Sequence, residues 1–278
     1  MTVASTHDDV EDWVQGTFGL TLDNYPAVRG VQVRGLLEEH PRSTWDALAP
    51  AVVAILSIPE THFLRHPECF DALSDRLRQL KTERPEGPVR LWSAGCASGE
   101  EAYNLAAVGH SIVGERIEVF GTDFSPTAVE KARKGVYGKW SLRGHDRSEM
   151  PWLGTDERGG LVVGLAVRNF VTFEVGQLAE PGPPSNIDVA FCRNVLIYFS
   201  DEGGSRVLDR IASSLRPDGV LVMAPTDPSP SRLKAWTPIQ LDAPRPVRAY
   251  RPPAGGSARP YGDPEPDLAQ TIRALLGR

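Results

Sequence analysis

The side chains best placed for chemistry in this chain follow a short apolar run, residues 91–94, and precede a helix-like stretch. Gly95 and Gly99 allow the backbone to turn sharply and to approach a ligand closely. Glu100 and Glu101 lie where the start of a helix favours negative charge. Parallel α/β sheets present nucleotide-like ligands to backbone amides at such a strand, glycine turn and helix. Two carboxylates repel a pyrophosphate, so the turn suits a ligand with a cation, hydroxyls or an amine. An ordinary turn with capping acids is the other interpretation.

Polar residues also follow three later strand-like runs. Asp123 follows residues 117–122, Gln177 and Leu178 follow residues 170–175, and Asn194 and Tyr198 follow residues 187–192. Parallel sheets bind ligands beyond the carboxyl ends of their strands, and an acid after the second strand can accept hydrogen bonds from both ribose hydroxyls. Taken singly, such an acid is often a helix cap, and a tyrosine in a mostly apolar stretch, such as Tyr198, is often a core aromatic. Their joint order with the glycine turn is typical of an S-adenosylmethionine site.

The elements that would carry these residues begin with a small helical domain over residues 1–81. Apolar residues recur at helix spacing in four stretches. They are Val10 to Phe18, Ala27 to Glu39, Trp45 to Leu56 with Ser43 or Thr44 as cap, and Phe70 to Leu80 after Pro67. Residues 82–88, TERPEGP, have the composition of a linker.

Residues 89–251 alternate strand-like and helix-like segments, which is typical of an α/β fold with a parallel sheet. The expected strands are Val89–Ala94, Ile117–Thr122, Ile187–Cys192 and Val220–Ala224, with helices from Ser125 to Gly135 and from Asp201 to Leu215. The turn Pro217-Asp218-Gly219 is expected to follow the second helix. Pro238–Asp242 and Val247–Arg251 predict a final antiparallel hairpin.

The alternation lapses over residues 136–176, which predicts a small β-rich insertion. Leu161–Val167 and Phe170–Val175 are expected to pair as antiparallel strands joined at Arg168-Asn169. The tail, residues 252–278, is rich in Pro and Gly and ends in a short amphipathic pattern. A helix packed on its own domain is favoured there over a docking helix for a partner.

Composition narrows the function classes. The chain has 278 residues, 41% of them hydrophobic, and a formal charge of −6, which argues against nucleic acid as the main partner. No apolar run is long enough to span a membrane, and the acidic start lacks a signal peptide's basic and apolar regions. Cys69, Cys96 and Cys192 have no metal-binding spacing and favour a reducing, cytoplasmic location.

Several segments resemble the chemotaxis-receptor glutamate methyltransferases, the CheR type. They are THFLRHPECFDAL, SAGCASGEEAY, FGTDFSPTAVEKARKGVY and DVAFCRNVLIYF, within a resemblance that runs from about Thr61 to Asp218. The resemblance implies a Rossmann-like class I methyltransferase sheet that binds S-adenosyl-L-methionine, with a β-subdomain inserted in it and a small helical N-terminal domain. It also implies a protein substrate with an acidic side chain, such as a chemoreceptor.

The resemblance also implies the roles of particular residues. Cofactor contacts would come from Thr61, Arg65, Glu101, Asp123, Gln177, Leu178, Asn194 and Val195, and the glycine turn itself adds Gly95. Arg65 and Tyr198 would lie by the transferred methyl and serve catalysis, while Glu100 is expected only to cap its helix. Without the resemblance, Arg65 has the pattern of a surface helix-cap arginine. His62 and His66 flank it and are either solvated or able to deprotonate a hydroxyl or amine substrate.

Transfer to a carboxylate agrees with the residues that the chain offers. A glutamate has a pKa of about 4.3, so at neutral pH it is already a nucleophile and no general base is required. Its attack on a sulfonium methyl neutralises opposite charges and gains from exclusion of water and in-line alignment. Arg65 would orient the carboxylate by paired hydrogen bonds.

The sequence departs from the family pattern at several positions. Leu64 stands where a second aromatic is usual, Pro59 where an asparagine is common, and residues 224–227, APTD, where a Gly-His-Ser-Glu-like segment often follows the strand. Residues 1–80 hold six arginines against twelve acidic residues, a net charge of −6 that does not suit an acidic receptor bundle. Two alternatives therefore stand beside a glutamate methyltransferase: a methyltransferase for a small molecule or a non-receptor protein, and a catalytically silent cofactor-binding regulator.

Overall fold

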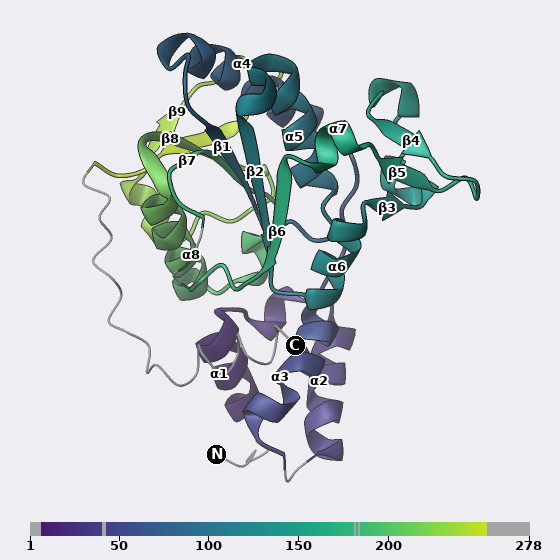
Figure 1. Cartoon of the computed structure of the whole chain (residues 1–278). Helices are drawn as coiled ribbons and strands as arrows, with labels where there is room; N and C mark the ends of the chain where they lie inside the picture. The colour runs from purple at the N-terminus through teal and green to yellow at the C-terminus, as the bar shows by residue number, and fades with distance from the viewer. Residues whose placement is uncertain (1–6, 41–42, 181, 183, 255–278) are drawn as a thin grey trace.

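The central element is a seven-stranded sheet with the order β6-β2-β1-β7-β8-β10-β9 (Figure 1). Its strands are β1 (Val89–Ala94), β2 (Ile117–Asp123), β6 (Val171–Val175), β7 (Ile187–Cys192), β8 (Leu215–Met223), β9 (Thr237–Ile239) and β10 (Arg248–Arg251). This computed structural model describes residues 7–40, 43–180, 182 and 184–254. Strands β6, β2, β1, β7 and β8 run parallel, whereas β10 and β9 close one edge as antiparallel strands. The predicted α/β class is confirmed.

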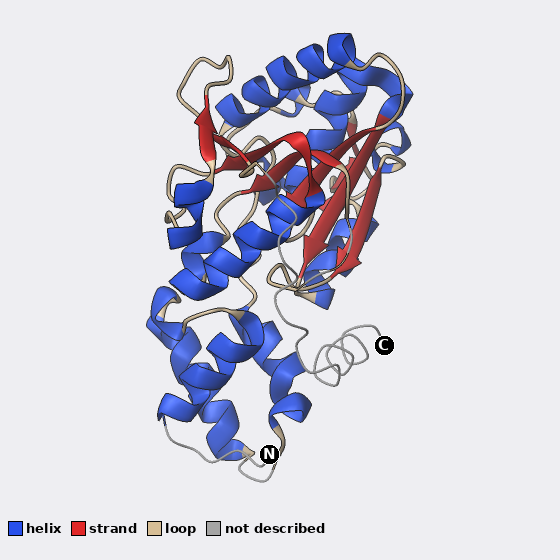
Figure 2. Cartoon of the chain, turned by 90° about the vertical axis from the view of Figure 1, so that its left-hand side faces the viewer, coloured by secondary structure: helices blue, strands red, loops and turns tan. Residues whose placement is uncertain are grey.

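Helices cover both faces of this sheet (Figure 2). Helices α4 (Pro67–Glu83), α5 (Glu100–Val113) and α6 (Pro126–Lys134) pack with β1 and β2 in one apolar cluster, and α8 (Asp201–Ser214) packs with β7 and β8 in another. Strand β7, IDVAFC, is buried at every residue, as expected of a central parallel strand. The strand order reverses between β1 and β7, which is the place where such sheets open a ligand crevice.

The N-terminal helices form a third apolar cluster of their own. They are α1 (His7–Phe18), η1 (Leu22–Asn24), α2 (Ala27–Glu39) and α3 (Trp45–Leu56), and the predicted Thr44 cap accepts a hydrogen bond from the Ala47 amide. This cluster lies below the sheet in Figure 1 and contacts the segment that follows β7. The Thr21 amide donates to the Tyr198 carbonyl at 3.1 Å, and Leu20 forms an antiparallel bridge with Phe199. No helix among the described residues is long and apolar enough to cross a membrane.

A separate three-stranded antiparallel sheet follows α6, with the order β3-β5-β4. It consists of β3 (Val136–Tyr137), β4 (Leu153–Thr155) and β5 (Leu161–Val163), with the short helices η3 (Lys139–Leu142), η4 (Arg147–Glu149) and α7 (Leu165–Arg168). The predicted pairing of Leu161–Val167 with Phe170–Val175 is wrong. Residues 165–168 turn into α7, and β6 pairs in parallel with β2 in the central sheet. Both segments are apolar and rich in valine, so their composition did not reveal that they belong to different sheets.

Other boundaries shift less. Strands β1 and β7 have the predicted bounds, and β9 and β10 pair as predicted although Thr237–Ile239 starts and ends earlier. Strand β8 begins at Leu215 and takes in the Pro217-Asp218-Gly219 stretch expected as a turn, with an irregular register opposite β7. Helix α4 runs into the expected linker as far as Glu83, and η2 (Gly114–Arg116) and η6 (Ser231–Ala235) add short turns. The proposed terminal helix lies outside the described residues.

Candidate functional site

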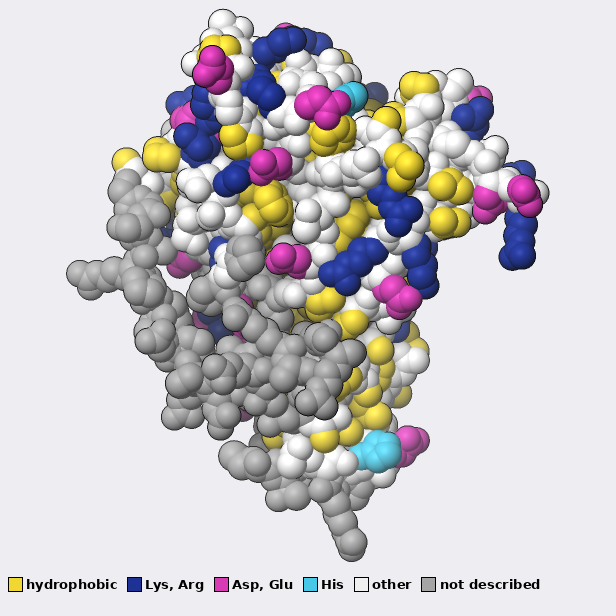
Figure 3. Space-filling model, viewed as in Figure 1, with side chains coloured by type: hydrophobic (Ala, Val, Ile, Leu, Met, Phe, Trp, Pro, Cys, Tyr) yellow, Lys and Arg dark blue, Asp and Glu magenta, His cyan; other side chains and the backbone are white. Residues whose placement is uncertain are grey.

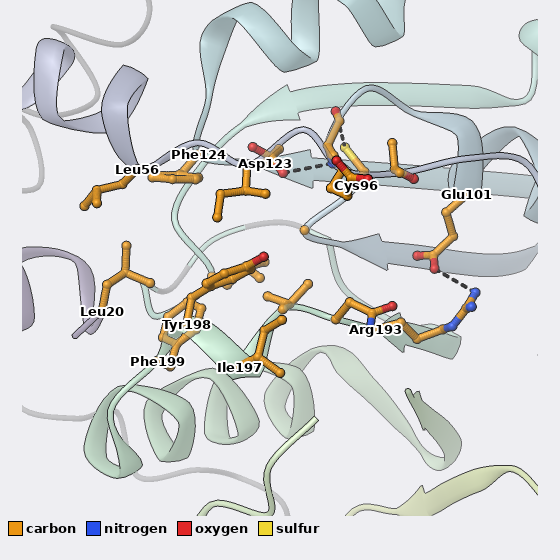
Figure 4. A pocket seen from close by; sticks show the side chains of 18 of the residues that line it. Leu20, Leu56, Cys96, Glu101, Asp123, Phe124, Arg193, Ile197, Tyr198 and Phe199 are labelled. Carbon is orange, nitrogen blue, oxygen red and sulfur yellow. Dashed lines mark hydrogen bonds and ion pairs between the residues drawn. The ribbon is translucent and has the colours of Figure 1, made fainter. Parts of the chain in front are cut away.

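A cavity of about 580 Å³ lies at the carboxyl ends of the parallel strands, enclosed on one side by the N-terminal helices. All ten residues predicted for cofactor binding or catalysis line it: Thr61, Arg65, Gly95, Glu101, Asp123, Gln177, Leu178, Asn194, Val195 and Tyr198. Figure 4 shows Glu101 and Arg193 at one end of this cavity and Leu20, Leu56 and Tyr198 at the other. The fold therefore joins a charged end to a mostly apolar end that the N-terminal helices complete.

Asp123 ends β2 and is 8% exposed. One carboxylate oxygen accepts a hydrogen bond from the Ala97 amide at 2.9 Å, and the other accepts one from the Ser125 amide at 2.9 Å. Burial raises the pKa of this carboxyl group, while the two amide hydrogen bonds oppose the rise. A carboxylate has about four acceptor positions, so each oxygen keeps capacity for a further donor such as a ribose hydroxyl.

Gly95 lets the turn after β1 pass close to the segment after β7. Its φ is +81°, in the region that favours glycine, and an added Cβ would lie 2.5 Å from Cγ2 of Val195. Ala97 and Asn194 also have positive φ values although they carry side chains. Non-glycine residues in this region are held there by their surroundings and cluster at binding sites.

Glu101 is the buried carboxylate at the charged end. It accepts a hydrogen bond from the Ser93 hydroxyl at 2.7 Å and forms a 3.0 Å ion pair with Nη1 of Arg193. Burial raises its pKa, and Arg193 and the Ser93 hydrogen bond oppose this effect. The Arg193 side chain is 1% exposed, lies over the rings of Phe70 and Phe191, and donates to the Arg65 carbonyl. The sequence prediction missed Arg193, although it adjoins Asn194 in the CRN motif.

Arg65 lies at the opening between the sheet and the N-terminal helices, half-buried. Its Nη1 donates to the Glu60 carbonyl at 2.9 Å, and no ion pair to its guanidinium occurs within the described part of the chain. Leu64 and His66 on either side have φ values of 53° and 58°, so the loop is tightly turned. Burial and the nearby Arg193 lower the pKa of Arg65. An anion bound here could pair with the guanidinium of Arg65, which has no carboxylate partner among the described residues.

Tyr198 stacks on Tyr25 of the N-terminal helical segment, with ring centroids 4.8 Å apart. Tyr25 is 7% exposed and directly precedes Pro26 and α2. Burial raises the pKa of Tyr198 above its usual value, so its hydroxyl stays protonated at neutral pH. The contact joins residues that are 173 positions apart in the printed sequence, and no local pattern around Tyr25 indicated it.

Asp227 fixes the segment that carries Asn194 and Val195. Its carboxylate accepts hydrogen bonds from the backbone amides of Asn194, Val195, Leu196 and Ala224, at 2.7 to 3.1 Å. This acid belongs to the APTD segment, which differs from the usual family pattern, and its place after the end of β8 was the signal that could have identified it. With four donors, it acts on the loop rather than on a ligand.

Glu100 differs from the expected role of a simple helix cap. It is 1% exposed and accepts hydrogen bonds from the hydroxyls of Ser98 at 2.7 Å and Ser141 at 2.9 Å. Ser141 lies in η3 of the inserted sheet, and its carbonyl accepts from the Phe63 amide. Glu100 therefore ties the start of α5 to the insertion and to the loop that carries Arg65.

The cavity contains polar atoms suited to S-adenosylmethionine. Both side-chain amide atoms of Gln177 and Oδ1 of Asn194 are buried without a hydrogen-bond partner. Buried polar groups normally have partners, so these atoms indicate a polar ligand. Glu101 and Asp123 add carboxylates suited to an amine or sulfonium and to ribose hydroxyls. Within the described residues, no group of His, Cys, Asp and Glu side chains could hold a metal ion.

Fold and site together define a class I cofactor-binding methyltransferase domain, and comparison with known families agrees. Residues 59–236 match the family described as CheR methyltransferase, SAM binding domain. The chain belongs to this family, which confirms the resemblance and S-adenosylmethionine as the cofactor of this domain.

Individual relatives match the same region. The chain is 36% identical over 190 residues to the "Probable biofilm formation methyltransferase WspC" of Pseudomonas putida, covering 64% of this chain and 44% of that protein. It is 33% identical over 199 residues to the "Chemotaxis protein methyltransferase" of Escherichia coli, covering 67% and 65%. The match thus spans between about half and two thirds of these relatives. The S-adenosylmethionine-bound magnesium protoporphyrin IX methyltransferase of Synechocystis is 18% identical, with a TM-score of 0.40, over 90% of this chain and 98% of that one.

Proposed function

We propose that this chain transfers a methyl group from S-adenosylmethionine to a glutamate carboxylate of a protein, forming a methyl ester. The observation that carries the proposal is Arg65, a cavity-lining guanidinium without an ion-pair partner in the described chain. A guanidinium binds a carboxylate through two parallel hydrogen bonds, which fixes the plane of the acceptor. The nearby Glu101 is already paired with Arg193 at 3.0 Å, so the guanidinium of Arg65 stays available to an acceptor carboxylate.

The proposed roles follow from the contacts of each side chain. Asp123 would accept the ribose hydroxyls, the amides of Gln177 and Asn194 would bind further polar atoms, and Glu101 would attract the positive charge of the cofactor. The cofactor, when bound, supplies an electrophilic methyl whose bond to sulfur breaks as the carboxylate oxygen bonds to it, leaving S-adenosylhomocysteine and the ester. Arg65 and the protonated hydroxyl of Tyr198 would hold the acceptor in line.

The chain needs no general base for this reaction. A glutamate is ionised at neutral pH, so no proton has to leave before the new bond forms. His62 would be a poor base for another acceptor because burial and the neighbouring Arg65 lower its pKa to about 4. This observation favours a carboxylate over the alternative hydroxyl or amine acceptors, since a base with so low a pKa draws a proton weakly.

A protein acceptor is supported by the names of the relatives, one of which is a chemotaxis protein methyltransferase. A chemoreceptor as the specific partner has weaker support, because the N-terminal residues are acidic overall. In Figure 3, hydrophobic side chains gather over the N-terminal helices, and Val28 and Val31 of α2 are 57% and 59% exposed.

We place the reaction in the cytoplasm, as the three cysteines are buried and unpaired.

The test uses the full chain with S-adenosylmethionine labelled in its methyl group and a lysate as the source of acceptors. The proposal expects label on protein that mild base releases as methanol, because esters hydrolyse where amide and amine methylation persists. Arg65→Gln should abolish this label while S-adenosylhomocysteine still binds, as measured by calorimetry. Base-stable label, or label on small molecules alone, would contradict a carboxylate acceptor. Cofactor binding without any label would support the silent regulator instead.

A further inference from the structure

A second cavity of about 300 Å³ lies beside the first. It is lined by Glu60, Thr61, His62, Arg65, His66 and Arg143, and the first four of these also line the main cavity. The two cavities therefore meet at the loop that carries Arg65. The main cavity accounts for the cofactor and the reacting carboxylate, whereas the second has no part in the reaction proposed above.

Two different elements supply the basic side chains of this second cavity. Arg65 and both histidines come from the loop before α4, and Arg143 comes from the end of η3 in the inserted sheet. Arg143 also lies over the ring of Trp140, with its guanidinium carbon 4.5 Å from the ring centroid. The insertion thus places a positive charge next to the loop that would orient the acceptor.

The acids near this cavity balance its charge only in part. Glu60 pairs with Arg143, and its side chain is 61% exposed. Glu68 lies 3.5 Å from Nδ1 of His66. No ion pair to His62 or Arg65 is present among the described residues, so an incoming anion would meet two groups without acidic partners.

The pKa of His62 indicates the electrostatic environment of this second cavity. Burial, as the largest cause, and the charged groups facing it, namely Arg65, His145, His66 and Arg193, together lower its pKa to about 4. None of these contributions comes from an acid. Burial and the neighbouring positive groups disfavour a protonated imidazole at this position. The same positive groups attract an anion.

We propose that the second cavity binds a second carboxylate of the acceptor, held by Arg143 and His62 while Arg65 holds the carboxylate that receives the methyl. This inference rests on the proposed function and adds a requirement to it: the acceptor carries at least two acidic groups close together. The carboxylate would displace Glu60 from Arg143, and the exposed Glu60 side chain can move into water. Specificity would then come from the inserted sheet as well as from the cofactor domain.

The test compares synthetic helical peptides that carry one glutamate with peptides that carry a second glutamate at increasing spacing. Binding is measured by calorimetry with S-adenosylhomocysteine present, so the result does not depend on methyl transfer. One two-glutamate spacing should bind about 5-fold tighter than the single-glutamate peptide, the gain expected from one partly buried ion pair. In proton NMR, that peptide should also raise the pKa of His62, because a carboxylate favours the protonated imidazole.

Variants test whether Arg143 supplies this preference. Arg143→Gln should remove the advantage of the second glutamate without changing the affinity for the single-glutamate peptide, and Arg143→Lys should restore most of it. Glu60→Gln should increase the advantage by freeing Arg143. Arg158→Gln, which removes an equal charge from an exposed site between β4 and β5, is the matched control and should have no effect.

Two outcomes would overturn the inference: equal affinity for both kinds of peptide, or an advantage that persists in Arg143→Gln. Methyl transfer is measured separately on the same peptides. If the two-glutamate peptide binds as expected and no ester forms, the second carboxylate site stands and the proposed function fails. Melting curves of each variant show whether a lost advantage reflects unfolding.

Discussion

The number of free acceptor positions separates two kinds of buried carboxylate in this molecule. Asp227 accepts four backbone amide hydrogen bonds, which uses the capacity of its two oxygens. Asp123 accepts only two, one on each oxygen, and lines the cavity. The same residue type is therefore structural in one place and available to a ligand in the other.

Replacing Asp123 by asparagine should weaken binding of both S-adenosylmethionine and S-adenosylhomocysteine. Hydrogen bonds to a charged group contribute about 1.5–3 kcal/mol, so we expect affinity to fall about 10- to 100-fold in calorimetry. Asp156→Asn is the matched control, because Asp156 also accepts backbone amide hydrogen bonds but lies in an exposed turn. Unchanged affinity in Asp123→Asn would remove this residue from the site.

At the scale of elements, two connections set the geometry of the cavity. The turn after β1 and the segment after β7 approach each other so closely that Val195 leaves no room for a Cβ at position 95. Asp227 then holds the second segment from the end of β8. The strand order places β1 and β7 side by side, so the cavity forms where neighbouring connections diverge.

Gly95→Ala should lower the free energy of unfolding by about 2–4 kcal/mol, since it combines a left-handed φ with overlap against Val195. Gly87→Ala is the matched control because Gly87 has a φ of +80° and no atom within 4 Å of an added Cβ. The difference between the two variants in urea unfolding isolates the overlap. Adding Val195→Ala to Gly95→Ala should recover part of the loss, and equal losses in the two glycine variants would disprove the close contact.

At the scale of the whole molecule, the N-terminal helices complete a site whose buried carboxylates come from the α/β domain. Tyr25 stacks on Tyr198, and the Asn24 side chain donates to the Phe199 carbonyl at 3.0 Å. Arg206 of α8 also donates to the Gln15 carbonyl. The N-terminal helices therefore contact both α8 and the segment after β7. The apolar end of the cavity therefore depends on the packing of the N-terminal helices.

Tyr25→Ala should destabilise the protein by about 3 kcal/mol, the usual cost of deleting a buried aromatic ring. It should also lower kcat, because the Tyr198 ring loses its support. Tyr25→Phe keeps the stacked ring and should change stability by less than about 1 kcal/mol. Chemical denaturation and methyl-transfer kinetics on both variants check this expectation, and a normal kcat in Tyr25→Ala would refute the positioning role.

Cofactor affinity and stability should respond to acid in opposite directions. Burial raises the pKa of Glu101 and Asp123, so the folded protein holds these protons more tightly than the unfolded chain does. These groups therefore add stability as pH falls through the interval between the unfolded and the raised folded pKa values, and lose it as pH rises. The proposed roles of Glu101 and Asp123 need both carboxylates ionised, so affinity for S-adenosylmethionine should weaken over the same interval.

Calorimetry over a series of pH values from neutral into the acid range, with melting curves at each pH, tests this pair of trends. Asp123→Asn should show a weaker dependence of cofactor affinity on pH, because one of the two titrating groups is gone. Loss of affinity that coincides with loss of the folded state would instead show that acid acts through unfolding.

Sequence alone located four of the five parallel strands along the chain, the family resemblance with its cofactor, and ten of the residues that line the cavity. Most of these features are local: apolar runs, a glycine turn, and polar residues immediately after strands whose carboxyl ends meet at one edge. Thr61 and Arg65 were implied by the family resemblance alone. The structure brings together all ten predicted residues, and their individual roles stay predictions.

Only the tertiary structure decided which distant segments meet. It moved β6 from the predicted hairpin into the central sheet, paired Tyr25 with Tyr198, and placed Arg143 beside Arg65. Strand pairing and ring stacking between remote segments depend on three-dimensional packing, which leaves no period in the sequence. Residue order and the family resemblance therefore predicted ten lining residues, whereas Arg193, Tyr25 and the contacts that enclose the site required the folded chain.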